Sequence, residues 1–239
     1  MPDSALAPSV APPRWALSLW ARAFRRVAQP WFVSRQVGRW CSPLSVQGAE
    51  NLATLNGPAI FVSNHSSHFD AYVLTALLPP HLRYRTGLAA AADRWYARKK
   101  WRANWYSLLV NIYPIQRGGG RAALSYSEEL LERGWSLIIF PEGTRAKRGH
   151  MEAFKFGVAI LALGKGVPIV PFHFKGTAAI LPPRARKARR APVEATIGEP
   201  LFFEPGTSLP DAVARLQEAV QALAGEPDEA VAVRPYAAA

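Results

Sequence analysis

Short apolar runs and amphipathic segments alternate along this chain from about residue 45 onwards. The apolar runs that predict strands lie at 59–63, 136–140, 167–174 and 193–197, and 108–115 is a further apolar run. The segments with helical patterning lie at 68–78, 122–133, 154–163 and 208–223. Such alternation favours an α/β layer architecture, because helices that follow strands pack back onto the faces of one sheet.

Glycine, proline and capping residues mark the ends of these elements. Pro79 and Pro80 stop the first helical segment, and Gly134 ends the second. Ser208, followed three residues later by Asp211, forms a capping box for the last helix. The chain contains no internal repeat, so we expect one domain at 45–225, followed by a tail at 226–239.

The N-terminal part has a different pattern. Residues 1–13 contain four prolines and are predicted to be disordered. Residues 14–44 are predicted to form an interfacial helical segment, in which Trp15, Leu19 and Ala23 share an apolar face and Arg22, Arg25 and Arg26 are available for lipid headgroups. The alternative is a helix that packs on the core of the domain, with its arginines solvated.

Charge is unevenly distributed along the chain. The formal net charge is +12 over 239 residues, but residues 1–190 carry +18 and residues 191–239 carry −6. The basic part needs an anionic partner, for which nucleic acid and an anionic membrane surface are the usual candidates. The lone Cys41 cannot form an intrachain disulfide, which favours a reducing, cytosolic setting. We expect neither a membrane-spanning helix nor a cleaved secretory signal.

A histidine and an aspartate lie five residues apart after the first predicted strand, within the segment Asn64-His65-Ser66-Ser67-His68-Phe69-Asp70. Residues five apart on one helix point about 140° away from each other, so His65 and Asp70 can pair only across a strand-to-helix turn. In that arrangement the carboxylate accepts a hydrogen bond from one ring nitrogen and the other nitrogen faces outward. This predicts an oriented general base that can take a hydroxyl proton.

Other interpretations of this segment are open. His65 and Asp70 can be a purely structural pair, and His68 competes for the role of base, although it would point elsewhere along a helix. Ser66 or Ser67 can be a nucleophile, but the chain has no Gly-x-Ser-x-Gly elbow, and we expect these serines to cap the helix. The five histidines show no zinc-type spacing, so no metal site is expected.

A second motif, Phe140-Pro141-Glu142-Gly143-Thr144-Arg145, follows the strand predicted at 136–140. Because both motifs follow strands, both can project from the same edge of a sheet. The turn at Gly143 lets the backbone approach a ligand, and the planar fork of Arg145 suits phosphate. Glu142 would repel an anion, so we expect it to accept hydrogen bonds from substrate hydroxyls or to brace an arginine. An exposed ion pair at a strand end is the structural alternative.

Together, these motifs resemble those of the glycerolipid acyltransferases. Asn64 to Asp70 fits the family's His-x4-Asp signature, and Phe140 to Arg145 matches its Phe-Pro-Glu-Gly-Thr-Arg block residue for residue. Phe154 to Gly157 resembles the segment that follows this block, and Val167 to Pro171 resembles the last block. The resemblance covers about residues 58–177 and implies a single α/β domain with a mixed, largely buried sheet flanked by helices.

The resemblance implies an O-acyltransferase of the 1-acylglycerol-3-phosphate acyltransferase type. His65 would deprotonate the free hydroxyl of a lysophospholipid, and Asp70 would fix the imidazole. The hydroxyl would attack the thioester of acyl-CoA or acyl carrier protein, and with 1-acylglycerol 3-phosphate as acceptor the product is phosphatidic acid. The acyl donor is a cosubstrate, so no bound cofactor is implied. Backbone amides at the start of the helix after His65 are the expected donors to the tetrahedral oxyanion.

The other implied roles concern the acceptor. The expected substrate-binding residues are Asn64, Arg117, Glu142, Gly143, Thr144, Arg145 and Lys155. Among them, Arg117 and Arg145 would clamp the phosphate. Arg117 falls where the family's second block ends in an arginine, but Asn111 to Gln116 replaces the usual lead-in. This departure leaves another lysolipid acceptor open, such as a lyso-ornithine lipid.

The basic and aromatic segments fit an enzyme that rests on an anionic membrane, and we expect a peripheral protein on the cytoplasmic side. Residues 94–105, which mix four aromatic with five basic residues, are predicted as a second interfacial element. The basic run 184–190 fits lipid headgroups, the phosphates of the acyl donor, or a solvated loop. A basic nucleic-acid-binding protein is the alternative from a different class, but it leaves both motifs unexplained, so no nucleic acid is expected.

Overall fold

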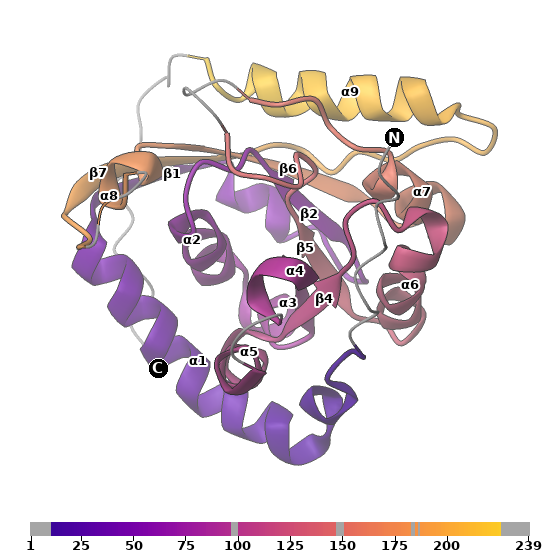
Figure 1. Ribbon diagram of the computed structural model, residues 1–239. Coiled ribbons are helices and arrows are strands. Elements are labelled where there is room, and N and C mark those ends of the chain that lie inside the picture. Colours follow the sequence, from indigo (N-terminus) through magenta and orange to yellow (C-terminus); the bar gives the residue numbers. More distant parts are fainter. Residues whose placement is uncertain (1–10, 97–99, 147–150, 183–184, 186, 226–239) are drawn as a thin grey trace, which may run out of the picture.

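The computed structural model describes residues 11–96, 100–146, 151–182, 185 and 187–225. They form a seven-stranded sheet in the order β1-β7-β6-β2-β5-β3-β4, with helices on both faces (Figure 1). Neighbouring strands are parallel except for β6 and β7, which are antiparallel, so the sheet is mixed. The predicted α/β fold with a mixed sheet flanked by helices is confirmed.

The elements follow one another in a mostly alternating order. The strands are β1 (Cys41–Gln47), β2 (Ile60–Ser63), β3 (Thr86–Ala91), β4 (Ile112–Ile115), β5 (Ser136–Ile139), β6 (Ile169–Lys175) and β7 (Ala191–Ile197). The longer helices are α1 (Leu19–Trp40), α2 (Phe69–Leu77), α5 (Lys100–Val110), α6 (Ser125–Glu132), α7 (Gly157–Lys165) and α9 (Leu209–Ala222). The short ones are η1 (Arg14–Leu17), η2 (Ala49–Leu52), α3 (Pro80–Arg83), α4 (Ala92–Trp95), η3 (Gly120–Leu124) and α8 (Thr177–Ile180).

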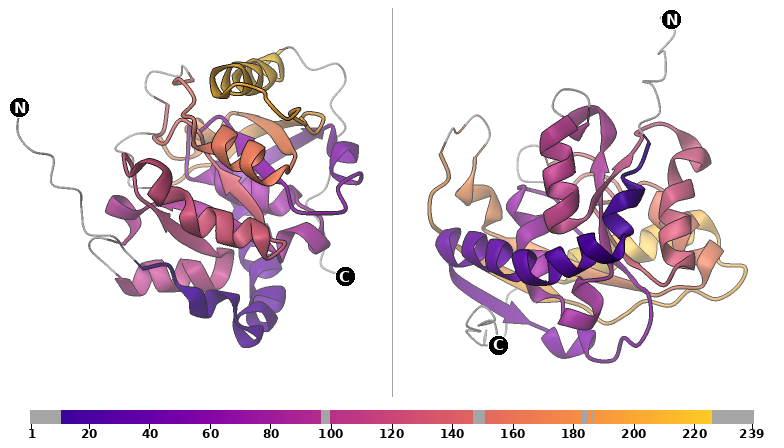
Figure 2. Two further views of the ribbon diagram at one scale, coloured as in Figure 1. Left: turned by 90° about the vertical axis from the view of Figure 1, so that its right-hand side faces the viewer. Right: turned by 90° about the horizontal axis from the view of Figure 1, so that it is seen from below.

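Each face of the sheet has its own hydrophobic core, because side chains alternate along each strand. Phe61 of β2 and Ile138 of β5 point into the core shared with α1, α2 and α5. Their neighbours Ile60 and Leu137 point into the core shared with α6, α7 and α9. Figure 2 shows the same layering from two further sides. Strands covered on both faces are apolar throughout, which is why these runs could be recognised in the sequence.

Most predicted elements are present with small shifts of their ends. Strands β2, β5, β6 and β7 and helices α2, α6, α7 and α9 lie at their predicted places. The Ser208 hydroxyl caps α9 by accepting a hydrogen bond from the amide of Asp211 at 3.2 Å. The apolar run at 108–115 is divided between α5 and β4. Asn111, with a φ of 53°, ends the helix and turns the chain into the strand.

The predicted interfacial segment is divided among η1, which holds Trp15, helix α1, which ends at Trp40, and β1, which takes the last residues. The large hydrophobic side chains that α1 leaves exposed are Leu19, Trp20, Phe24, Val27 and Trp31. No helix in the described ranges combines the length and apolarity needed to cross a membrane.

Arg25 differs from the expectation that it faces lipid headgroups. Its side chain is buried, and its guanidinium donates to the carbonyl oxygens of Ala16 and Ser107 at 3.0 Å and of Leu108 at 3.1 Å. Burial lowers the pKa of Arg25 to about 10. Carbonyl groups at the end of α5 need donors that the helix cannot supply, and Arg25 provides them from α1. It therefore fastens α1 to α5.

The second predicted interfacial element divides into two parts. Trp101 and Trp105 of α5 are exposed, whereas Tyr96 is buried and Trp95 lies half-buried against Tyr106. Residues 97–99, 184 and 186 lie outside the described residues, as do residues 1–10 of the stretch predicted to be disordered at 1–13 and the tail at 226–239. Of the basic run, Lys187, Arg189 and Arg190 are exposed.

Candidate active site

The two sequence motifs meet at one edge of the sheet. Strands β2 and β5 are parallel neighbours with Val62 opposite Ile139, so the segments that follow them leave the sheet side by side. The ring of His65 stacks on Phe140 with ring centroids 4.1 Å apart. The amide of Ala146 donates to the carbonyl oxygen of His65 at 2.6 Å. The carboxyl ends of neighbouring strands are where α/β sheets bind ligands.

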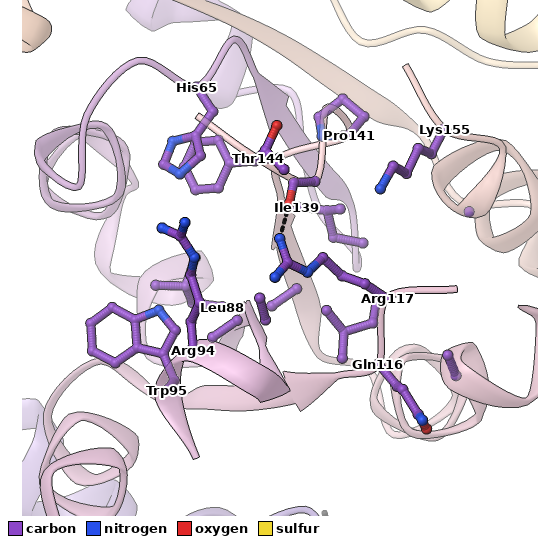
Figure 3. A pocket seen from close by; sticks show the side chains of 18 of the residues that line it. His65, Leu88, Arg94, Trp95, Gln116, Arg117, Ile139, Pro141, Thr144 and Lys155 are labelled. Carbon is purple, nitrogen blue, oxygen red and sulfur yellow. Dashed lines mark hydrogen bonds between the residues drawn. The ribbon is translucent and has the colours of Figure 1, made fainter. Parts of the chain in front are cut away.

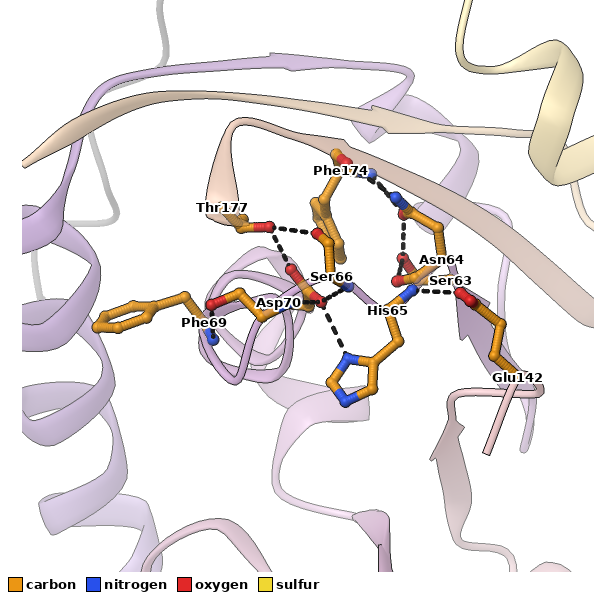
Figure 4. A network of polar contacts seen from close by, with 10 residues as sticks. Ser63, Asn64, His65, Ser66, Phe69, Asp70, Glu142, Phe174 and Thr177 are labelled. Atoms are coloured by element: carbon orange, nitrogen blue, oxygen red, sulfur yellow. Dashed lines mark hydrogen bonds and ion pairs between the residues drawn. The ribbon is translucent and has the colours of Figure 1, made fainter. Parts of the chain in front are cut away.

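His65 and Asp70 form the predicted pair. Nδ1 of His65 lies 2.9 Å from Oδ2 of Asp70, which is fully buried in the first turn of α2 (Figure 4). Because an ionised carboxylate can only accept, Nδ1 carries the proton and Nε2 keeps its lone pair. The imidazole lines a cavity beside the two motifs, so this lone pair is available to a ligand there.

Backbone amides at the start of α2 have a different role from the one expected. The amides of Ser66 and Ser67 both donate to Oδ2 of Asp70 at 2.8 Å. The amide of His65 donates to Glu142 at 2.6 Å. These three N–H groups hold the base and its carboxylate, so the expectation that they bind the oxyanion is corrected.

The predicted capping role of the serines is also only partly met. His68 is the N-cap residue of α2, and its side chain makes no capping bond. Ser67 accepts a hydrogen bond from the amide of Phe69 at 3.3 Å, whereas the Ser66 hydroxyl pairs with Thr177 at 2.9 Å.

Glu142 braces the site rather than facing a substrate. Its side chain is 3% exposed, and its two oxygens accept from the amides of His65 at 2.6 Å and Glu152 at 2.9 Å. Burial raises the pKa of this carboxyl group. Because two buried amides need an acceptor here, the expected hydrogen bonds to substrate hydroxyls or to an arginine are replaced by bonds to the backbone.

Asn64, the other residue expected to bind substrate, also has a structural role. Its amide nitrogen donates to the carbonyl oxygen of Phe174 at 2.9 Å, and its Oδ1 accepts from the amide of Phe174 at 2.8 Å. These two bonds extend the pairing of β2 with β6 by one residue. Neither Asn64 nor Glu142 is among the described residues that line the cavity.

The cavity has a volume of about 390 Å³ and a cationic side. Four cationic side chains line it, namely Arg94, Arg117, Arg145 and Lys155. Figure 3 shows Arg94 extending toward the ring of His65, with Arg117 and Lys155 on the opposite side. Arg117 donates to the carbonyl oxygen of Gly143 at 3.5 Å and forms an ion pair with Asp93. The predicted residues Gly143 and Thr144 line the same wall.

Gly143 lies in the turn at which Lys155 crosses the second motif. Its φ is +68°, and a Cβ atom there would lie 2.6 Å from Nζ of Lys155. The left-handed backbone favours glycine, whereas the flexible side chain of Lys155 could move away from an added Cβ.

The remaining walls of the cavity are apolar. They are formed by Ala71, Tyr72, Leu88, Ala90, Tyr106, Val110, Ile112 and Ile139. His68 also lines the cavity, and burial, together with the charge of Arg145, lowers its pKa to about 4. It is therefore neutral at pH 7. In the described part of the chain, no three His, Cys, Asp or Glu side chains are arranged to hold a metal ion.

Sequence reasoning missed two residues of this site. Arg94 was assigned to a membrane-facing segment, and only the end of β3, which was not predicted, brings it to the cavity. Thr177 was not singled out, although its hydroxyl contacts Asp70. The Gly176-Thr177 pair directly after the predicted strand was the available signal.

An outward-facing imidazole base beside cationic and apolar walls can activate a hydroxyl group of an amphiphilic anion. Residues 43–175 match the family model described as Acyltransferase, and the chain belongs to this family. The resemblance drawn from the motifs is thereby confirmed.

Relatives of this chain carry a consistent name. It is 33% identical over 141 residues to the chloroplastic 1-acyl-sn-glycerol-3-phosphate acyltransferase BAT2 of Brassica napus. The aligned region covers 57% of this chain and 38% of the relative. This chain is 33% identical over 144 residues to LPAT1 of Arabidopsis thaliana, covering 58% and 38%. The chain thus spans about two fifths of the length of these relatives.

A solved structure has the same fold. The 1-acyl-sn-glycerophosphate acyltransferase PlsC of Thermotoga maritima superposes with a TM-score of 0.64 at 22% identity, covering 84% of this chain and 77% of that one.

Proposed function

We propose that this protein transfers an acyl group from acyl-CoA or acyl carrier protein to the free hydroxyl of 1-acylglycerol 3-phosphate, giving phosphatidic acid. The observation that carries the proposal is the presence of the His65–Asp70 base and four cationic side chains in one cavity with apolar walls. The names of the relatives support the same acceptor.

The chemistry assigned to His65 is general acid–base catalysis. Nε2 takes the proton of the acceptor hydroxyl as its oxygen attacks the thioester carbonyl. The tetrahedral intermediate then expels the thiolate, which takes the same proton back from Nε2. Asp70 stabilises the imidazolium that exists between these steps, because its carboxylate accepts from Nδ1 at 2.9 Å.

Three cationic side chains besides Arg94 suit the acceptor phosphate. Arg117, Arg145 and Lys155 line the cavity, and guanidinium groups can bind phosphate through two parallel hydrogen bonds. Arg94 extends toward His65 (Figure 3). This position supports a role for its guanidinium in stabilising the negative charge that develops on the thioester oxygen. The apolar walls suit the acyl chains.

An acyl-transfer assay tests this proposal. Purified protein is incubated with labelled acyl-CoA or acyl carrier protein and a panel of lysolipids that includes 1-acylglycerol 3-phosphate and a lyso-ornithine lipid. We expect phosphatidic acid as the main product and none from the His65→Ala variant. If acyl transfer occurred only to another lysolipid, that lysolipid would replace 1-acylglycerol 3-phosphate as the proposed acceptor. Undiminished transfer by His65→Ala would refute the role of His65 as the base.

The same proposal includes an anionic membrane surface as a partner, on its cytoplasmic side. Helices α1 and α5 expose Trp20, Trp31, Trp101 and Trp105, which are 58%, 67%, 68% and 52% exposed. Three of them, Trp20, Trp101 and Trp105, line a hollow of about 430 Å³ together with Trp15 of η1. Aromatic side chains beside arginines on one surface are typical of proteins that bind at a membrane interface.

Vesicle sedimentation tests the membrane surface. Substituting Trp20 and Trp105 together by alanine should weaken partition to vesicles that contain phosphatidylglycerol on the order of 10-fold. Phe202→Ala, which removes an aromatic side chain that is 66% exposed outside these helices, serves as the control and should partition like the wild type. Equal partition of both variants, or retention on DNA instead of vesicles, would contradict the assignment.

A further inference from the structure

We propose that Thr177 is a positioning residue for the base, which holds the carboxylate of Asp70 in the orientation that His65 requires. The inference rests on the proposed function and adds a third structural element to its site. His65 and Asp70 come from the junction of β2 and α2, whereas Thr177 is the first residue of α8, after β6.

Contacts of the Asp70 carboxylate show why one more donor matters. Oδ2 accepts from Nδ1 of His65 and from the amides of Ser66 and Ser67, at 2.8 to 2.9 Å. Oδ1 accepts from the hydroxyl of Thr177 at 2.5 Å. The bond from Thr177 reaches the opposite oxygen, so it opposes rotation of the carboxylate about its bond to Cβ.

The hydroxyl of Thr177 has a defined direction. Its single proton points to Asp70, so in its contact with Ser66 at 2.9 Å it is the acceptor and Ser66 is the donor. The three groups form a chain of hydrogen bonds from Ser66 through Thr177 to Asp70. Such chains polarise each bond in them, which strengthens the bond to the carboxylate. Figure 4 shows this chain on the side of Asp70 away from Glu142.

Backbone geometry fixes the position of Thr177. The preceding Gly176 has a φ of +93°, and a Cβ atom there would lie 2.1 Å from the carbonyl oxygen of Pro192. The turn is therefore set by the packing of the β6 end against the start of β7. Thr177 is fully buried, and it is not among the described residues that line the cavity. It can act on the reaction only through the groups that its hydroxyl contacts, Asp70 and Ser66.

The consequence for catalysis is a specific kinetic pattern. Without the hydroxyl, Oδ1 of the buried Asp70 carboxylate has no hydrogen-bond donor. An unpaired buried oxygen is costly, so rotation of the carboxylate toward other donors becomes favourable. The imidazole then loses its fixed orientation, which slows proton transfer but leaves substrate binding unchanged. A loss of orientation of this kind is expected to lower kcat about 10-fold to 100-fold without raising KM.

Three variants test the proposal in the acyl-transfer assay. Thr177→Val removes the hydroxyl at nearly constant shape, and Thr177→Ser keeps it. Thr75→Val is the matched control, because Thr75 is also buried, on α2, and its hydroxyl donates only to the carbonyl oxygen of Ala71, at 2.7 Å, among the contacts described. We expect the loss in kcat for Thr177→Val alone, with Thr177→Ser and Thr75→Val within about threefold of the wild type.

Nitrogen NMR of the His65 ring provides a readout that does not depend on the acyl acceptor. In the wild type the proton should reside on Nδ1, and in Thr177→Val the form protonated on Nε2 should grow. A wild-type protein without transferase activity would refute the proposed function and leave this readout in place. Thr177→Val with wild-type kcat and an unchanged spectrum would overturn the role of Thr177. If neither Thr177→Val nor Thr177→Ala accumulates as folded protein, the hydroxyl is structural and the proposal fails.

Discussion

The two ends of the catalytic cavity are built in opposite ways. At one end, Asp70 is fully buried and accepts four hydrogen bonds, and Glu142 is 3% exposed and holds the backbone of His65. At the other end, long cationic side chains reach the cavity from several loops, and Thr144 and Lys155 are exposed.

The difference corresponds to the two tasks of the proposed function. Proton transfer depends on the position of one ring nitrogen, so its support is buried and saturated with hydrogen bonds. Binding a phosphate depends mainly on charge, which several flexible side chains can share. Substitutions at the buried end should therefore change kcat, and substitutions at the cationic end should change the KM of the acceptor.

The largest effect is expected for Asp70→Asn. The amide can keep its oxygen toward Nδ1 and the two backbone amides, with its NH2 group facing the Thr177 hydroxyl, but it has no negative charge to stabilise the imidazolium that forms when Nε2 takes the proton. We expect kcat to fall on the order of 10³-fold to 10⁴-fold with KM nearly unchanged. Steady-state kinetics at varied acceptor concentration measure both constants. A raised KM at constant kcat would contradict the assignment of kcat effects to the buried end and KM effects to the cationic end.

Glu142→Gln should have the next largest effect. One oxygen that accepts a backbone N–H is replaced by an NH2 group, which leaves a buried donor unpaired at a cost of about 1 to 3 kcal/mol. We expect a lower melting temperature and a lower kcat, measured by thermal unfolding and by the assay. If the acceptor KM rose instead, with stability intact, the sequence-based role of Glu142 in substrate binding would be restored.

This contrast also explains which parts of the molecule could be predicted from sequence. Strands β2, β5 and β6 are continuous apolar runs because helices cover both of their faces, so their pattern is strong. Strand β3, Thr86–Ala91, consists largely of alanine and glycine and has no such pattern. Its position is fixed by pairing with β4 and β5, which a local pattern does not contain.

In the site, side-chain chemistry was predictable but the choice of partner was not. The His65–Asp70 pair follows from spacing across a turn, and Arg117, Arg145 and Lys155 reach the cavity as expected. A carboxylate such as Glu142 suits a substrate hydroxyl and a backbone amide equally well. Which one it meets depends on tertiary contacts with segments far along the chain, as with the amide of His65.

At the cationic end, Arg145→Ala should act on binding. Removing one charged hydrogen-bonding group from the phosphate should raise the acceptor KM about 10-fold to 100-fold and leave kcat within a few-fold of the wild type. Arg121→Ala, which removes a cation that is 79% exposed and paired with Glu128 outside the cavity lining, is the control. An equal rise in KM for both variants would show that the acceptor is held by non-specific electrostatic attraction to the basic surface rather than by contacts in the cavity.

The smallest effect concerns His68, which lies between the two ends. Burial and the charge of Arg145 lower its pKa to about 4, with smaller contributions in the same direction from His65 and Arg94 and an opposing one from Asp70. The unfolded chain, with a histidine pKa of about 6.5, therefore binds this proton more readily than the folded protein. Stability that is present above pH 6.5 should be lost as the pH falls toward 4.

Comparing His68→Gln with the wild type isolates this contribution. The variant cannot take up the proton, so its melting temperature should fall less than that of the wild type between pH 6.5 and pH 4, and kcat at pH 7 should change little. Calorimetry across this interval measures the difference. If the melting temperatures of the two proteins fell equally with pH, His68 would be solvated enough to titrate with the ordinary pKa of a histidine. In that case the solvent-accessible, cationic end of the cavity would extend as far as the first turn of α2.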